Sequence, residues 1–405
     1  MSRILLGVAG GIAAYKACLL LRLFTEAGHE VTVVPTPGAL NFVGEATWAA
    51  LSGRPVRTEV WQDADQVPHV ALGRRAELVV VAPATADLLS RAATGRADDL
   101  LTNVLLTATC PVLMAPAMHT EMWLHPATRA NVATLRERGA IVLDPDSGRL
   151  TGADTGPGRL PEPADIEQVA LSLLTSGVAE AARARDLLGV RLAVSAGGTR
   201  EALDPVRHLG NASSGRMGMA IARAALLRGA EVTVVAGATT APPVTGAEVV
   251  SVTSTGDLAA AMTTLAPEMD VIVMAAAPSD FTPAEPSSVK LKKDGDSGIE
   301  LRLAQTTDVL AALVRSRRDG QVMVGFAAET AAGPDELLEL GRAKLARKGC
   351  DLLVLNDVSG GAVFGAADNT VTILDSAGVV DRVGADKNLV AHRILDAVVN
   401  WRKSH

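Results

Sequence analysis

Two glycine-rich turns, almost half the chain apart, have the pattern of phosphate-binding turns. Gly10-Gly11 follows the apolar run 4–9, and Gly197-Gly198 follows the apolar run 192–196. A strand that leads through such a turn into a helix presents unpaired backbone N–H groups at the helix N-terminus. These groups and the helix dipole both favour an anion. The sequence therefore predicts two ligands that carry phosphate.

Nicotinamide dinucleotides are common ligands of such turns, but the sequence disfavours them here. The first turn reads G-x-x-G-G, and the strand that follows its helix ends at Pro35-Thr36 without the acidic residue that binds a ribose. In the second half the corresponding strand, 232–235, ends at Ala236-Gly237. An NAD(P) oxidoreductase with tandem Rossmann-like units is therefore kept only as an alternative.

Continuous apolar runs indicate the strands that must position these turns. Residues 78–82 and 111–115 are apolar throughout, which is typical of parallel strands buried on both faces. A chain of 405 residues is also long enough for two domains of about 100–200 residues each. We therefore predict two Rossmann-like, three-layer α/β domains, 1–175 and 188–405, joined by a polar linker at 176–187.

Composition argues against several classes of partner. The net charge is -7 and only 2% of residues are aromatic, whereas nucleic-acid binding needs basic clusters or stacking rings. No apolar run is long enough to span a bilayer, and no signal peptide precedes the first strand. Cys18, Cys110 and Cys350 lack the spacing of a zinc site or a disulfide framework. We expect a cytoplasmic protein that binds neither nucleic acid nor membrane.

Loops that follow the first-half strands carry the most specific motif. The string from Pro116 to Trp123, PAMHTEMW, resembles the P-x-M-N-x-x-M-W signature of the flavin-dependent cysteine decarboxylases. With GGIAAYK at 10–16 and PATA at 83–86, the first half resembles phosphopantothenoylcysteine decarboxylase. The resemblance implies a flavodoxin-like domain that forms trimers and binds FMN. It implies FMN contacts at Gly10, Gly11, Ile12, Thr36, Pro83, Ala84 and Thr85.

The same resemblance implies a reaction and its residues. In the family the flavin oxidises the cysteinyl side chain to a thioaldehyde, the thiocarbonyl accepts the electrons left by CO₂, and reduced flavin returns the hydride. His69 matches the active-site histidine, and a neutral imidazole near the thiol can steer its deprotonation. His119, Met122 and Arg159 match substrate-binding positions.

Two positions depart from that pattern. His119 stands where the signature has Asn, although an imidazole can still donate a hydrogen bond to a carboxylate. In the flap, 150–162, the G-P-G-R core is present, but the proton-donating cysteine of the family falls at Gly152. Either Asp154 or a bound water then reprotonates the product, or the first half is a weaker catalyst. A ligase fused to a mainly structural flavin module is therefore a second alternative.

The second half carries a different set of polar motifs. The serine and glycine turn 211–218 can direct several backbone amides at one anion. Lys344 and Lys348 are four residues apart, so both ammonium groups can meet one triphosphate. No P-loop pattern is present. From Arg191 to about Trp401 these strings resemble the bacterial, CTP-using phosphopantothenate–cysteine ligases, so the whole chain resembles the fused bifunctional enzyme of coenzyme A synthesis.

This resemblance implies that CTP activates 4′-phosphopantothenate as an acyl-cytidylate and that cysteine then displaces CMP to give 4′-phosphopantothenoylcysteine. Asn211 matches a contact to the acyl intermediate, Lys290 a catalytic residue and CTP contact, and Arg207 a substrate contact. A magnesium ion is expected with the nucleotide, its ligands unknown. Ligase dimers joined to decarboxylase trimers would give a homo-dodecamer. The further implied CTP contacts are Ala275, Ala276, Asp280, Thr307, Asp308, Val309, Leu310, Phe326, Lys344 and Lys348.

Overall fold

The computed structural model describes residues 1–58, 68–150, 154–292, 300–358 and 368–405. The chain forms two compact units, Met1–Arg185 and Asp186–His405. The division falls inside the predicted linker 176–187, but most of that segment is a helix, α9 (Val178–Ala184). Val178, Ala179 and Ala182 are buried on one side of α9. The polar composition of the segment concealed this short apolar face.

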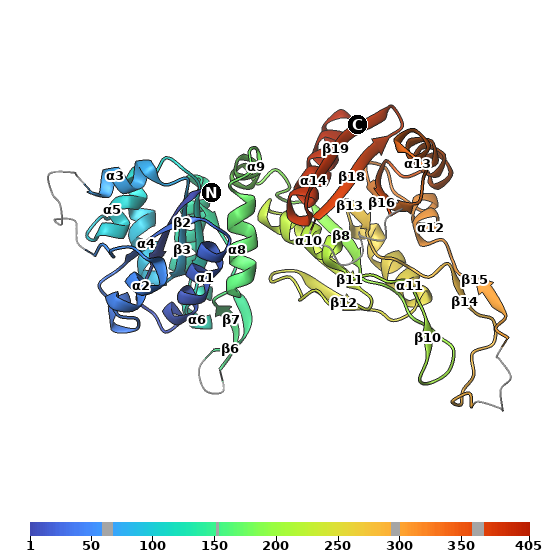
Figure 1. Cartoon of the computed structure of the whole chain (residues 1–405), viewed down its shortest axis with the longest axis horizontal. Coiled ribbons are helices and arrows are strands. Elements are labelled where there is room, and N and C mark those ends of the chain that lie inside the picture. The colour runs from blue at the N-terminus through green and yellow to red at the C-terminus, as the bar shows by residue number, and fades with distance from the viewer. Residues whose placement is uncertain (59–67, 151–153, 293–299, 359–367) are drawn as a thin grey trace. The chain divides into compact units, whose positions relative to one another are not determined.

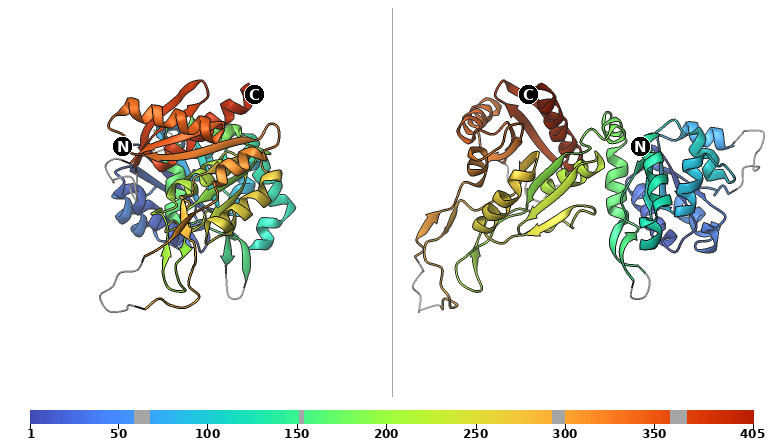
Figure 2. Two further views of the ribbon diagram at one scale, coloured as in Figure 1. Left: turned by 90° about the vertical axis from the view of Figure 1, so that its right-hand side faces the viewer. Right: turned by 180° about the vertical axis from the view of Figure 1, so that it is seen from behind.

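The first unit is a parallel sheet covered by helices on both faces (Figures 1 and 2). Its strand order is β2-β1-β3-β4-β5, and every pairing is parallel. Helices α4, α5 and α7 pack on one face, and α1 lies against α8. The strands are β1 (Arg3–Val8), β2 (Glu30–Pro35), β3 (Leu78–Ala84), β4 (Val112–Pro116) and β5 (Ile141–Val142), followed by the hairpin of β6 (Asp146–Arg149) and β7 (Thr155–Arg159). The helices are α1 (Ala14–Glu26), α2 (Glu45–Ser52), α3 (Pro68–Arg75), α4 (Ala86–Thr94), α5 (Leu100–Thr107), α6 (Thr120–Leu124), α7 (Pro126–Glu137) and α8 (Pro163–Ser172), with a 3₁₀ turn at Ala39–Asn41.

The second unit has an eight-stranded sheet of order β12-β11-β8-β13-β16-β17-β18-β19. Pairings are parallel up to β17, and β18 and β19 add an antiparallel edge. The strands are β8 (Arg191–Ala196), β11 (Glu231–Ala236), β12 (Glu248–Ser251), β13 (Val271–Met274), β16 (Val322–Glu329), β17 (Leu352–Asp357), β18 (Asp368–Asp375) and β19 (Gly378–Asp386), with two small pairs, β9 (Glu201–Ala202) with β10 (His208–Leu209) and β14 (Phe281–Pro283) with β15 (Leu303–Gln305). The helices are α10 (Arg216–Leu227), α11 (Thr255–Leu265), α12 (Val309–Arg315), α13 (Pro334–Lys348) and α14 (Lys387–Ser404), with a 3₁₀ turn at Ala266–Glu268.

Successive side chains of the second sheet point to opposite faces, so the sheet has an apolar layer on each face. Val194, Val273 and Val354 face the core that α10 and α14 cover. Ile272 and Leu353 face the other core, which includes residues of α11, α12 and α13. The predicted fold class, two three-layer α/β domains, is therefore confirmed. Within the described residues, no helix is long and apolar enough to cross a membrane.

A buried arginine connects the first residue of the second unit to its last helix, α14. Arg228 is 1% exposed, and its guanidinium donates to Asp186 at 2.6 and 2.8 Å and to Asp396 at 2.8 Å. It also donates to the backbone carbonyl of His392 at 3.1 Å. These contacts fix the first residue of the unit against α14.

We predict that the stability of this unit falls on acidification because of His392. The side chain is 3% exposed, and burial, assisted by the nearby Arg228 charge, lowers its pKa to about 4. An unfolded histidine has a pKa of about 6.5, so the unfolded chain takes up the proton first and stability is lost as pH falls from about 6.5 to about 4. Denaturant midpoints measured across this range should decline for the native chain and decline less for His392→Phe. Equal slopes would contradict the assignment.

Candidate active sites

A cavity of about 900 Å³ lies in the first unit at the carboxyl ends of β1, β3 and β4. This is the edge where ligands bind in open α/β sheets. Among the residues that line it are nine of the predicted positions, namely Gly10, Gly11, Ile12, Thr36, Pro83, Thr85, His119, Met122 and Arg159. Ala84, the remaining predicted FMN contact, is buried in β3 and does not line the cavity in the described residues.

The first glycine turn of this cavity is shaped by close backbone contact. A Cβ at Gly10 would lie 2.7 Å from the carbonyl carbon of Gly38, so a side chain has no room there. The helix that follows, α1, has no side-chain cap and no acidic residue in its first turn. No side chain of the helix therefore competes with an anionic ligand for the positive end of the helix dipole, which agrees with the prediction from the sequence.

The β6–β7 hairpin, which is the predicted flap, docks on the motif loop. The backbone N–H of Met118 donates to the carbonyl of Gly158 at 2.9 Å. Gly158 has φ +149°, and a Cβ there would overlap the carbonyl oxygen of Met118. Only glycine allows this approach, and the next residue, Arg159, lines the same cavity as His119.

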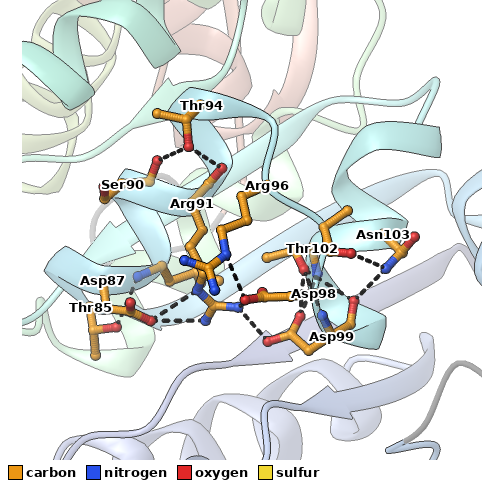
Figure 3. Close-up of polar contacts among 12 residues, drawn as sticks. Thr85, Asp87, Ser90, Arg91, Thr94, Arg96, Asp98, Asp99, Thr102 and Asn103 are labelled. Atoms are coloured by element: carbon orange, nitrogen blue, oxygen red, sulfur yellow. Dashed lines mark hydrogen bonds and ion pairs between the residues drawn. The ribbon is translucent and has the colours of Figure 1, made fainter.

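One wall of this cavity contains a charge cluster centred on Arg91 (Figure 3). The Arg91 side chain is 14% exposed and bonds to Asp87, Asp98 and Asp99 at 2.7 to 3.0 Å. Burial opposes the charge of Arg91, but the carboxylates outweigh it and raise the pKa of the guanidinium. Asp99 also caps α5 by accepting from the N–H of Thr102 at 2.8 Å. The cluster fixes the loop between α4 and α5.

Two predicted catalytic residues of the first half do not line this cavity in the described part of the chain. His69 lies on α3, where its carbonyl accepts from Thr107 at 2.9 Å, and its Nδ1 is buried with no hydrogen-bond partner among the described residues. Asp154 is exposed just before β7. Gly152 falls outside the described residues.

The second unit has a cavity of about 750 Å³ at the carboxyl ends of β13, β16 and β17. Asn211 lines it and donates from Nδ2 to the carbonyl of Pro278 at 2.8 Å. The cavity gathers residues from segments more than a hundred positions apart. The predicted positions in its lining are Asn211, Ala275, Ala276, Asp280, Thr307, Asp308, Val309, Leu310, Phe326, Lys344 and Lys348.

The two lysines of α13 are paired with carboxylates. Lys344 Nζ lies 2.6 Å from Glu329, and Lys348 binds Asp308. Burial would raise the pKa of Asp308, but the Lys348 contact outweighs it and the net shift is downward. The lysines share one helix face, as the spacing predicts, and an incoming phosphate must compete with these carboxylates.

Lys290 and Arg207 do not line this cavity in the described residues. The Asp204 side chain is fully buried and accepts from Arg207 at 2.6 and 2.9 Å and from the N–H of Leu291 at 3.1 Å. These Arg207 contacts lower the pKa of Asp204. Arg207 also donates to the Leu291 carbonyl at 2.6 Å. The observed role of Arg207 is thus to hold the segment that carries the exposed Lys290.

Comparison with known proteins identifies the family. A family model described as "Flavoprotein" matches residues 1–175, and one described as "DNA/pantothenate metabolism flavoprotein C-terminal domain" matches residues 187–401. The "Coenzyme A biosynthesis bifunctional protein CoaBC" of Mycobacterium tuberculosis is 55% identical over 98% of this chain and 96% of its own length. The chain belongs to the CoaBC family. The CoaBC protein of Bacillus subtilis is 41% identical over 91% of this chain and 89% of its own.

Solved structures similar to each half of the chain are also known. The C-terminal domain of a CoaBC protein is 32% identical, with a TM-score of 0.45, over 55% of this chain and 100% of that domain. The FMN-dependent cysteine decarboxylase SpaF is 31% identical, with a TM-score of 0.38, over 43% of this chain and 98% of its own. The predicted resemblance to the bifunctional enzymes of coenzyme A synthesis is confirmed by the family.

Two asparagines in the cavity of the second unit were not predicted as site residues. Asn356 and Asn369 both line it, and each has a buried Oδ1 with no hydrogen-bond partner among the described residues. Asn356 pairs with Val371, so Asn369, two positions away, lies on the same face of the sheet. Buried polar atoms are rarely left unpaired, so these oxygens are candidate acceptors for a ligand. In the sequence, the polar pair Asn356-Asp357 after an apolar run could have indicated a site residue. Nothing in the sequence around Asn369 indicated one.

Lys16 was also missed in the flavoprotein unit. It lines the cavity, and its Nζ lies 2.9 Å from Glu162, which Arg159 also binds. Burial would raise the pKa of Glu162, but Lys16 and Arg159 outweigh it and lower the pKa. The flap arginine is thereby held to α1. The GGIAAYK motif contains Lys16, so the sequence held the signal.

Proposed function

We propose that the second unit ligates cysteine to 4′-phosphopantothenate through an acyl-cytidylate made from CTP. The observation that carries this proposal is that Asn211, Asp280 and Lys348, which lie on separate segments, line one cavity beside α10. Asn211 would hold the acyl intermediate, and the cations would offset charge that develops when the carboxylate attacks the α-phosphate. Cysteine's amine then displaces CMP, and its proton leaves to solvent.

We assign no residue to a metal in this unit. Among the described residues, no group of three His, Cys, Asp or Glu side chains lies close enough to hold an ion. Any magnesium ion would therefore be bound largely by the phosphates of CTP, as is usual for Mg²⁺ with nucleotides.

We propose that the first unit binds FMN and decarboxylates 4′-phosphopantothenoylcysteine to 4′-phosphopantetheine. The cavity fits such a group, because the Gly10 turn has no room for a side chain and the uncapped α1 terminus favours a phosphate. Bound flavin would supply the oxidation and later reduction of the cysteinyl carbon. His119 would donate a hydrogen bond to the substrate carboxylate, and Arg159, held by Glu162, would keep the flap over the cavity.

We further propose that this site is completed between copies of the chain. Among the described residues His69 does not line the cavity of its own unit. Its Nδ1 atom is buried and has no hydrogen-bond partner among those residues. A trimer of flavoprotein units would bring it to a neighbour's cavity, and ligase dimers would join trimers into a dodecamer. Solution mass tests this, and a monomer with full decarboxylase activity would exclude it.

A single preparation tests the two activities. An absorbance spectrum of the full chain should show bound flavin, and a coupled assay should show pyrophosphate release from CTP followed by CO₂ release. Flavin without CO₂ release would favour the alternative in which the first unit is structural. A nicotinamide spectrum would restore the oxidoreductase alternative.

We predict that His69→Asn retains bound flavin and full ligase activity but decarboxylates about 10²-fold more slowly, an effect of the size of a lost general base. Among the described residues His69 does not line the cavity of its own unit, so the flavin content is the internal control. A rate close to that of the native chain would leave His69 as a structural residue.

We also predict that thiol-blocking reagents leave both activities largely intact. Among the described residues, Cys18, Cys110 and Cys350 do not line either cavity. Burial raises the pKa of all three thiols, to about 11 for Cys350, so little reactive thiolate exists at neutral pH. Complete inactivation that follows labelling of one cysteine would show that this residue acts in place of Asp154 or water.

A further inference from the structure

A second cavity of the first unit, about 440 Å³, lies at the opposite edge of the sheet from the cavity of about 900 Å³ described above, which we call the cofactor cavity. It includes residues that precede two strands, Cys110 before β4 and Ala140 before β5, and the end of α4. We call it the amino-edge cavity. Its apolar lining includes Leu105, Val112, Met114 and Leu135.

Guanidinium groups supply the charge of the amino-edge cavity. Arg91, Arg96, Arg138 and Arg183 line it, and no described carboxylate does. The first two already pair with carboxylates (Figure 3): Arg91 binds three aspartates, and Arg96 lies 2.8 Å from Asp98. Arg138 and Arg183 form no ion pair with a carboxylate of the described residues. The cavity is therefore electropositive over an apolar floor.

Arg138 and Arg183 are the groups left for a ligand. Arg138 Nη1 donates to the backbone carbonyl of Ala93 at 2.6 Å. Arg183 Nε is buried and has no hydrogen-bond partner within the described ranges. Cys110 and Arg183 line the same cavity, and the charge of Arg183 partly opposes the rise that burial causes in the pKa of the Cys110 thiol. A buried donor without a partner costs free energy, so this arrangement indicates a missing acceptor.

We propose that the amino-edge cavity binds a small phosphate monoester with an apolar part, whose phosphate is held by Arg138 and Arg183. Guanidinium forks match phosphate oxygens, and a monoester carries nearly two charges at neutral pH. The volume is within the range of small-molecule pockets. Arg91 lines both this cavity and the cofactor cavity, so a ligand here sits against the charge cluster that bounds the flavin site.

The test measures protection of Cys110 in the full-length protein, with phenyl phosphate as the probe. Iodoacetamide labels thiols slowly at about pH 8.5, and peptide mass spectrometry gives a rate for each cysteine. At ten times its dissociation constant, phenyl phosphate should slow labelling of Cys110 by about tenfold. Labelling of Cys18, which does not line this cavity, should not change and reports an intact fold.

Matched variants and probes decide the outcome. Arg183→Gln and Arg138→Gln should each raise the dissociation constant of phenyl phosphate by about tenfold, the effect of a lost charged hydrogen bond, so that protection at the same concentration falls to about twofold. Arg22→Gln, which removes an exposed arginine of α1, should not. Benzyl alcohol, which lacks the phosphate, should give no protection. Absence of protection by phenyl phosphate, equal protection in Arg183→Gln, or a Cys110 that another copy covers and that never labels would each overturn the proposal.

Discussion

Lys290→Gln is expected to release pyrophosphate from CTP and 4′-phosphopantothenate about 10²–10³-fold more slowly than the native chain, the loss typical of a removed charge-stabilising group. The ammonium would offset charge that develops while the α-phosphate is attacked. In the structure Lys290 is exposed, beside a Leu291 that Asp204 and Arg207 hold by its backbone. Pyrophosphate release without added cysteine is the measurement.

Asn211→Asp is the matched comparison for this result. Its amide lines the cavity and would act mainly in the second step, so this variant should still release pyrophosphate and then accumulate the bound intermediate. A melting curve controls for a purely structural role, because Asn211 also ties its turn to Pro278. Equal loss of pyrophosphate release in both variants would contradict the division of steps.

Arg228→Met is expected to lower the stability of the second unit by about 3 kcal/mol, a value in the range for breaking a buried ion pair. The substitution leaves Asp186 and Asp396 without their partner and the His392 carbonyl without a donor. Methionine keeps much of the apolar volume, so the loss measures chiefly the polar contacts. Hydrogen exchange of α10 and α14 peptides in the full chain reports this unit directly.

Arg393→Met is the control for that prediction. Arg393 pairs with Asp381 at 2.7 Å, but its side chain is 46% exposed. Solvent screening limits such a pair to about 1 kcal/mol or less. If the two variants accelerate exchange equally, burial of Arg228 has no energetic consequence and the predicted difference is wrong.

Two features of the sequence were sufficient for the fold and family. Continuous apolar runs such as 78–82 and 111–115 became buried parallel strands, because side chains covered on both faces must be apolar at every position. Short motifs placed after those runs became cavity linings, since parallel strands bring their carboxyl ends to one edge. Thr85, His119 and Asp280, which follow such strands, accordingly line the two cavities.

The predicted linker shows where local composition misleads. Its alternation of alanine with arginine and glutamate looks polar as a whole, yet α9 buries only the small residues of one face. A short helix needs little apolar surface, so averages over the segment conceal it.

The sequence by itself determined the sheets, the glycine turns and the motif loops, because these depend on periodicity, conformational freedom and neighbours along the chain. Only the tertiary structure showed that His69 and Lys290 stand apart from the cavity linings in the described residues, and that Arg207 holds Leu291 through Asp204. It also brought Asn369 beside Asn356 through an antiparallel register. Such pairings join residues that no local pattern links, because they depend on how separate strands and turns pack in space.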